Sequence, residues 1–136
     1  MTIGEALPLG VRAWGWMLRV EWRRRRLSLD DLIAWLEGIP PDPRRALTAG
    51  AALLAARRAC GWSPSGTSCL KISLVALALL RRAGCPARLM IGVRDARRPV
   101  QAHAWLEIDG VPLDPLASDY VPLRRPEGVG APRFRP

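Results

Sequence analysis

The sharpest constraint on the fold is a change in the spacing of apolar residues near residue 84. Before this point apolar side chains recur every three or four positions, which is the pattern of amphipathic helices. Beyond Pro86 they alternate with polar side chains, which is the pattern of half-buried strands. We expect helices over residues 5–26, 29–38, 44–59 and 69–82, and strands over residues 87–94, 100–108 and 111–114. Helices followed by a small antiparallel sheet define an α+β fold.

The helix predicted over residues 69–82 is apolar on nearly every side, so it should be the buried central helix. It follows Gly61–Ser68, a run of turn formers and helix caps that cannot continue a helical pattern. The pair Asp109-Gly110 is a strong hairpin signal before the last predicted strand. From Pro115 onward the periodicity disappears, and we expect residues 116–136 to form an irregular tail.

Length and cysteine content limit the class of protein. A chain of 136 residues, 49% of them hydrophobic, can bury one core and is expected to be a single domain. Its three cysteines include no C-x-x-C pair, which suits neither a disulfide framework nor a zinc site. No apolar run reaches the length of a membrane span, and the first residues lack the pattern of a signal peptide. We therefore expect a cytoplasmic protein that uses neither a metal nor another cofactor.

The chain is strongly basic, with 21 basic residues, 12 acidic residues and a formal net charge of +9. A positive surface potential attracts anionic partners, such as nucleic acid, an anionic lipid surface or an acidic peptide. The arginine run Arg23–Arg26 falls at the end of the first predicted helix, where cations are favourable. We interpret this run either as a solvated helix end or as a docking site for an acidic peptide, a partner protein or a membrane surface.

Cys69 and His103 are the candidates for nucleophilic chemistry. Cys69 opens the central helix, where unpaired N–H groups and the helix dipole favour the nucleophilic thiolate. His103 is the only histidine, and the alternation of its predicted strand places it on one face with Trp105. A thiol served by a histidine base is an arrangement for covalent acyl transfer. Cys60 and Cys85 lack a capping loop and a nearby base, so we expect them to be structural.

An acidic residue should orient the histidine by accepting a hydrogen bond from its second ring nitrogen. Asp109 belongs to the hairpin turn, whereas Asp114 lies in the returning strand and can come alongside His103, so Asp114 is preferred. Two tryptophans are candidates for contact with substrate. Trp105 shares the face of His103, and Trp62 precedes the loop that leads to Cys69, although packing alone would also account for each.

Four sequence blocks are informative together, namely Ser68–Leu70, Leu79–Leu89, Ile91–Arg94 and Ala102–Gly110. They resemble the leader peptidases of lasso-peptide biosynthesis, a family in the transglutaminase-like branch of the papain-like cysteine proteases. Each block alone is a weak signal. Together they place a cysteine at a helix start, Gly-x-Pro-Ala-Arg before a strand and His-Ala-Trp-x-Glu in the next strand, which is the order of the family. The resemblance is close over residues 60–115 and looser over the N-terminal helices.

The resemblance implies a papain-like or transglutaminase-like catalytic core over residues 61–115, behind a helical segment over residues 1–60. It implies a catalytic triad in which Cys69 is the nucleophile, His103 the general base and acid, and Asp114 the orienting group. Enzymes of this family remove the leader from the precursor of a ribosomally synthesised and post-translationally modified peptide (RiPP). A papain-type oxyanion glutamine would stand six positions before the nucleophile, where this chain has Ser63, so the second oxyanion donor is not identified.

Partners and alternative functions follow from the same resemblance. The chain is too short for a fused leader-binding domain, so it resembles the stand-alone (split) form. We expect it to act on a precursor peptide with a separate leader-binding protein and an ATP-dependent lasso cyclase. A transglutaminase-like acyl transferase would use the same triad with an amine in place of water. A non-enzymatic basic domain would instead bind nucleic acid through its net charge, a partner that a peptidase does not require.

Overall fold

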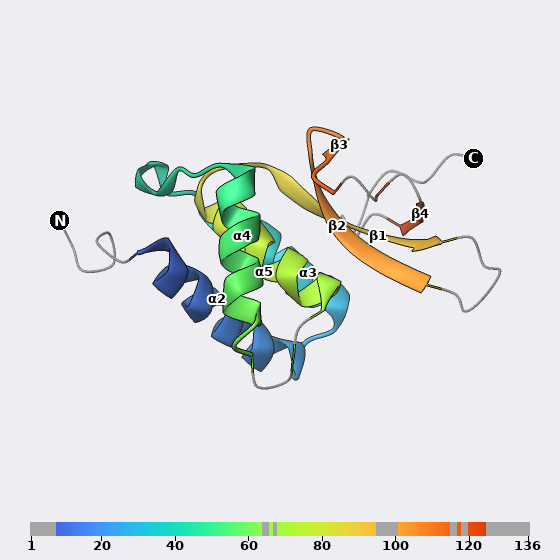
Figure 1. The fold of residues 1–136 in the computed structure, drawn as a ribbon, viewed down its shortest axis with the longest axis horizontal. Coiled ribbons are helices and arrows are strands. Elements are labelled where there is room, and N and C mark those ends of the chain that lie inside the picture. The colour runs from blue at the N-terminus through green and yellow to red at the C-terminus, as the bar shows by residue number, and fades with distance from the viewer. Residues whose placement is uncertain are drawn as a thin grey trace.

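Helices form the first part of the chain and strands the second, as Figure 1 shows. The computed structural model describes residues 8–63, 66, 68–94, 101–114, 117 and 120–124. The helices are α2 (Leu9–Arg24), α3 (Leu29–Glu37), the short 3₁₀ helix η1 (Pro43–Arg45), α4 (Ala49–Cys60) and α5 (Cys69–Arg82). The strands are β1 (Ala87–Arg94), β2 (Gln101–Ile108), β3 (Val111–Pro112) and β4 (Tyr120–Arg124). The predicted α+β fold is confirmed, while residues 5–7 and Val100 of the predicted elements lie outside the described residues.

Hydroxyl side chains define where α3, α4 and α5 begin. The N-caps Ser28, Thr48 and Ser68 each accept a hydrogen bond from the backbone N–H three residues further on, that of Asp31, Ala51 and Lys71 respectively. The prediction of one helix over residues 44–59 is wrong at its start. Pro43–Arg45 forms a separate 3₁₀ turn, and Thr48 then caps a new helix.

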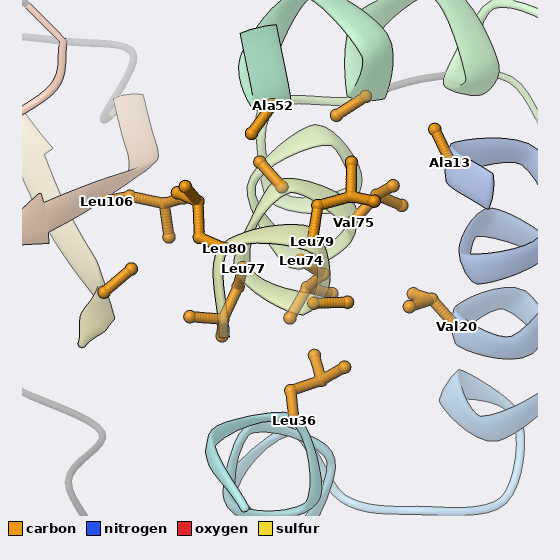
Figure 2. Close-up of a cluster of buried hydrophobic side chains, with 14 of the residues drawn as sticks. Ala13, Val20, Leu36, Ala52, Leu74, Val75, Leu77, Leu79, Leu80 and Leu106 are labelled. Atoms are coloured by element: carbon orange, nitrogen blue, oxygen red, sulfur yellow. The ribbon is translucent and has the colours of Figure 1, made fainter. Parts of the chain in front are cut away.

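Helix α5 is the centre of the core. Its buried residues are Lys71, Ser73, Leu74, Val75, Ala76, Leu77, Ala78, Leu79 and Leu80. Figure 2 shows the side chains that surround it, namely Ala13 and Val20 from α2, Leu36 from α3, Ala52 from α4 and Leu106 from β2. Burying one large aliphatic side chain contributes about 1.5–3 kcal/mol. Because α5 is packed on several sides, the position of its first turn is fixed by the core.

The sheet is antiparallel, in the order β3-β2-β1-β4. Strand β1 pairs with β2 along its whole length and places Gly92 opposite His103. Ala104 and Leu106 of β2 belong to the core around α5. On the other face, Trp105 forms a second apolar cluster with Met90, Ala117 and Tyr120. The alternation along β2 therefore gives the strand one face for the core and another for His103 and Trp105.

Two predictions about the sheet are wrong. The tail predicted to be irregular from residue 116 contains β4, which pairs with β1, while residues 125–136 lie outside the described residues. The strand predicted over residues 111–114 ends at Pro112, so Asp114 lies beyond it. Proline removes a hydrogen-bond donor and confines a strand to the edge of a sheet. Pro112 and Pro122 lie in β3 and β4, the two edge strands, and they weaken the sequence signal for both.

Candidate active site

His103 has a carboxylate against its ring. Its Nε2 lies 2.5 Å from Oδ2 of Asp114, and the two side chains are 17% and 25% exposed. The turn at residues 109–110, where both residues have positive φ, reverses the chain, and the N–H of Leu113 donates to the carbonyl of Leu106. These contacts bring Asp114 alongside His103. With a proton on Nε2 donated to the carboxylate, Nδ1 keeps the lone pair that a general base needs.

Two aromatic rings flank His103. The ring centroid of Trp105 lies 5.9 Å away in a stacked arrangement, and that of Tyr120 on β4 lies 4.9 Å away. Trp105 is buried, and its Nε1 lies 3.4 Å from Oε2 of Glu107. The imidazole thus lies against two rings and a carboxylate, which restrict its rotation.

Cys69 is the first residue of α5 and follows directly on the N-cap Ser68. The first N–H groups of a helix do not enter its internal hydrogen bonds, and they lie at the positive end of the helix dipole. The backbone N–H of Cys69 is therefore suited to donate to a negatively charged oxygen. Cys69 is half-buried and packs against the core cluster, so it is anchored while part of it stays exposed.

Cys69, His103 and Asp114 line one small cavity of about 120 Å³. Ser73, one helical turn after Cys69, also lines it, and its Oγ donates to the carbonyl of Ala104 at 3.3 Å. This hydrogen bond ties α5 to β2 next to His103. The structure therefore brings together the three residues that the sequence analysis selected for the triad, which come from α5, β2 and the segment after β3.

The two candidate substrate contacts lie in different places. Trp105 lines the cavity with Cys69. Trp62, which lies beyond the end of α4 at Cys60, is not among the residues that line this cavity. It is 81% exposed and lines an apolar depression of about 640 Å³ between α2 and α4. Proximity to Cys69 in the sequence was therefore a poor guide to the position of Trp62.

The other two cysteines are poorly suited to nucleophilic chemistry. Cys60 is buried, and this burial raises the pKa of its thiol to about 11. Burial, and then the negative charge of Asp109, also raise the pKa of the Cys85 thiol. The thiolate is the reactive form of cysteine. A raised pKa therefore disfavours the reactive form at both residues.

Iodoacetamide at pH 7.5 is expected to modify Cys69 before Cys60 and Cys85. With a pKa of about 11, roughly one in 3000 Cys60 thiols is ionised at this pH, and the side chain is also buried. Peptide mass mapping of timed samples measures the three rates. Modification of Cys60 as fast as that of Cys69 would contradict this ranking.

Sequence reasoning missed three residues around the site. Tyr120 lies in a tail segment where Pro122 hides the strand pattern. Ser73 and Lys71 lie in an otherwise apolar helix, and both are buried with polar contacts. The available signal was the presence of these two polar residues on the predicted buried helix, because a buried polar group needs hydrogen-bond partners.

Neither a group of metal ligands nor a membrane-spanning helix is found in the part of the chain that the structure describes. Over these residues no group of three or more His, Cys, Asp or Glu side chains is placed to hold a metal ion. Over the same residues, none of the helices combines the length and the apolar character that crossing a membrane requires.

Helices followed by a curled antiparallel sheet, with a cysteine opening the central helix and a His-Asp pair beside it, are the features of a transglutaminase-like core. The model of the transglutaminase-like superfamily matches residues 13–125. The chain belongs to this superfamily, whose members include cysteine proteases and acyltransferases. Comparison with curated proteins and with solved structures finds no match.

Proposed function

We propose that this protein is a cysteine endopeptidase that removes the leader peptide from a lasso-peptide precursor. The observation that carries this proposal is the cavity shared by Cys69, His103 and Asp114, with Nε2 of the histidine 2.5 Å from the carboxylate. Membership of the transglutaminase-like superfamily supports thiol-dependent acyl chemistry. Within that chemistry, the sequence blocks around Cys69 and His103 favour a leader peptidase.

The reaction has two stages. Sγ of Cys69 attacks the carbonyl carbon of the last leader residue, and the thiol proton passes to His103. The C–N bond then breaks, His103 gives the proton to the departing amine, and the leader remains as a thioester on Cys69. In the second stage His103 takes a proton from water, the resulting hydroxide attacks the thioester, and the C–S bond breaks to release the leader acid, while His103 returns the proton to Sγ of Cys69.

The charges that develop in this reaction have two proposed stabilisers. The carboxylate of Asp114 stabilises the imidazolium form of His103 and keeps Nδ1 as the nitrogen that exchanges protons. The backbone N–H of Cys69 donates to the oxyanion of the tetrahedral intermediate. Both groups are in place before substrate binds, so they require little reorganisation during the reaction.

The proposed partners are the precursor peptide, a separate leader-binding protein and the ATP-dependent lasso cyclase, all in the cytoplasm. One face of α2 supports docking of a protein, because it exposes four large apolar side chains, Val11, Trp14, Leu18 and Trp22. Part of the arginine run is engaged within the molecule. The guanidinium of Arg23 lies 3.9 Å from the ring centroid of Trp35, and that of Arg26 lies 4.1 Å from the ring centroid of Trp22.

The proposal is tested by incubating the protein with the cognate precursor and its leader-binding partner, with and without an added primary amine. Mass spectrometry should detect the leader as a free acid and the core with a free amino terminus. A leader–amine conjugate formed in preference to the acid would instead support an acyl transferase. A precursor that stays intact in the presence of the partner would refute both activities.

The Asp114→Asn variant is expected to lower kcat/KM for leader cleavage by about 10²- to 10⁴-fold. Asparagine keeps the size of the side chain but removes the charge that stabilises the imidazolium. Asp109→Asn is the matched control, because Asp109 has a φ of 52° and asparagine also tolerates this conformation. This control should cleave at the rate of the unsubstituted protein. A large loss of cleavage in Asp109→Asn with normal cleavage in Asp114→Asn would assign the orienting role to Asp109.

A further inference from the structure

Lys71 carries a buried ammonium group two residues after Cys69. It is the only lysine in the chain and is 2% exposed. Its Nζ lies 3.0 Å from Oε1 of Glu21 on α2, donates to Oγ of Ser63 at 2.8 Å and donates to the carbonyl of Gly66. An ammonium group is a donor only, with three N–H groups, and all of these partners are oxygen acceptors.

The contacts of Lys71 hold the residues that lead to Cys69. Ser63, Gly66 and Ser68, called here the approach residues, precede Cys69 in the chain. The side chain of Lys71 binds the first two, and its backbone N–H donates to Oγ of Ser68 at 3.2 Å. Glu21 anchors the ammonium to α2, so Lys71 connects the approach residues to the helical core.

The chemistry of this position is unusual for a core helix. Burying an ammonium group costs free energy that an apolar side chain of similar size does not incur. An apolar pair in place of Lys71 and Glu21 would fill the same space between α2 and α5. What the lysine side chain adds to simple packing is a set of directed hydrogen bonds, and those to Ser63 and Gly66 reach the approach residues.

We propose that Lys71 is a positioning residue that fixes the approach residues and, through them, the backbone N–H of Cys69 that stabilises the oxyanion. This inference rests on the acyl chemistry proposed for Cys69. Misplacing a catalytic donor by about 1 Å costs roughly 10²-fold in rate. Alkylation of the thiol by iodoacetamide forms no oxyanion, so it does not depend on this donor.

The test compares an acyl transfer with an alkylation at the same sulfur. In the reaction with p-nitrophenyl acetate, Sγ of Cys69 bonds to the acetyl carbon and the thiol proton passes to His103. The ester C–O bond breaks and p-nitrophenolate leaves, which absorbance detects. Cys69→Ala supplies the background rate. The rate of iodoacetamide modification of Cys69, measured by mass spectrometry, is the reference, because this reaction needs no oxyanion donor.

The main variant is the pair Lys71→Met/Glu21→Leu. The single change Lys71→Met would leave the carboxylate of Glu21 without its ammonium partner inside the protein, whereas the pair replaces both charges with apolar side chains of similar size. Thermal unfolding and circular dichroism confirm that the pair is folded. Glu21→Gln is the matched control, because its amide oxygen can still accept from Lys71 and the hydrogen bonds of Lys71 to Ser63 and Gly66 remain. Its folding is checked in the same way, since it leaves the ammonium group without a carboxylate.

The paired variant is expected to react with p-nitrophenyl acetate about 10- to 100-fold more slowly than the unsubstituted protein, while its alkylation rate changes by no more than about twofold. Glu21→Gln should lose less than about threefold in acetylation. Equal acetylation in the paired variant, or equal changes in both reactions, would overturn the role of Lys71 and leave the proposed function standing. Absence of Cys69 acetylation in the unsubstituted protein would refute the proposed function, and the role of Lys71 with it.

Discussion

The Cys69→Ala variant is expected to leave the precursor uncut and to unfold at nearly the same temperature as the unsubstituted protein. Loss of the nucleophile prevents formation of the thioester and lowers kcat by roughly 10⁶-fold. Cleavage at the remaining rate is below the detection limit of a product assay. The side chain is half-buried and lines a cavity, so removing its sulfur leaves few lost contacts. Mass spectrometry of the precursor and circular dichroism against temperature measure the two results.

Two further variants make this result specific. His103→Ala should also abolish cleavage, because the thiol proton would have no acceptor. Cys85→Ala removes a half-buried thiol outside the cavity and should cleave normally. Full turnover by Cys69→Ala would refute the assignment of the nucleophile, and full turnover by His103→Ala would refute that of the base. Loss of cleavage in Cys85→Ala would show that losing a cysteine outside the cavity also stops the reaction, so the loss in Cys69→Ala would not identify the nucleophile.

The helices could be predicted because their apolar faces and caps are local features. Ser68 and the run of apolar residues after it predict both the start of α5 and its burial, and the structure has the helix over Cys69–Arg82. The start of α4 was missed because Pro43 opens a short 3₁₀ turn and Thr48 opens the longer helix. Two adjacent start signals were combined into one helix, which shows that element boundaries are less certain than element types.

The candidate triad could be selected because its members are recognisable alone. Cys69 follows a cap, His103 is the only histidine, and Asp114 follows a hairpin turn. The surroundings of the triad were not predictable in the same way. Tyr120 reaches His103 through the pairing of β4 with β1, and Lys71 reaches Glu21 through the packing of α5 on α2. Such contacts join distant segments of the chain, so no local pattern encodes them.

Gly92→Ala is expected to destabilise the protein by about 1–3 kcal/mol, which lowers its unfolding temperature by about 4–10 °C. Gly92 lies opposite His103 in the sheet, and Trp105 on the same face of β2 covers it. A Cβ at this position would lie 2.8 Å from Cη2 of Trp105 and 2.8 Å from the backbone oxygen of Val121. The indole must move, and the backbone of β4 has little freedom to do so. Differential scanning calorimetry measures the change.

The displaced indole should also reduce leader cleavage, because Trp105 stacks on the imidazole of His103. A shift of the base by about 1 Å costs roughly 10²-fold in rate. The loss of leader cleavage should therefore be larger than the fraction of unfolded protein at the assay temperature explains.

Gly15→Ala is the matched control, because a Cβ there meets no atom within 4 Å and alanine favours the interior of α2 by about 0.5–1 kcal/mol. The two glycine variants should therefore change stability in opposite directions. An unfolding temperature for Gly92→Ala at or above that of the unsubstituted protein would mean that Trp105 can move without cost, and its packing would then not be what holds His103.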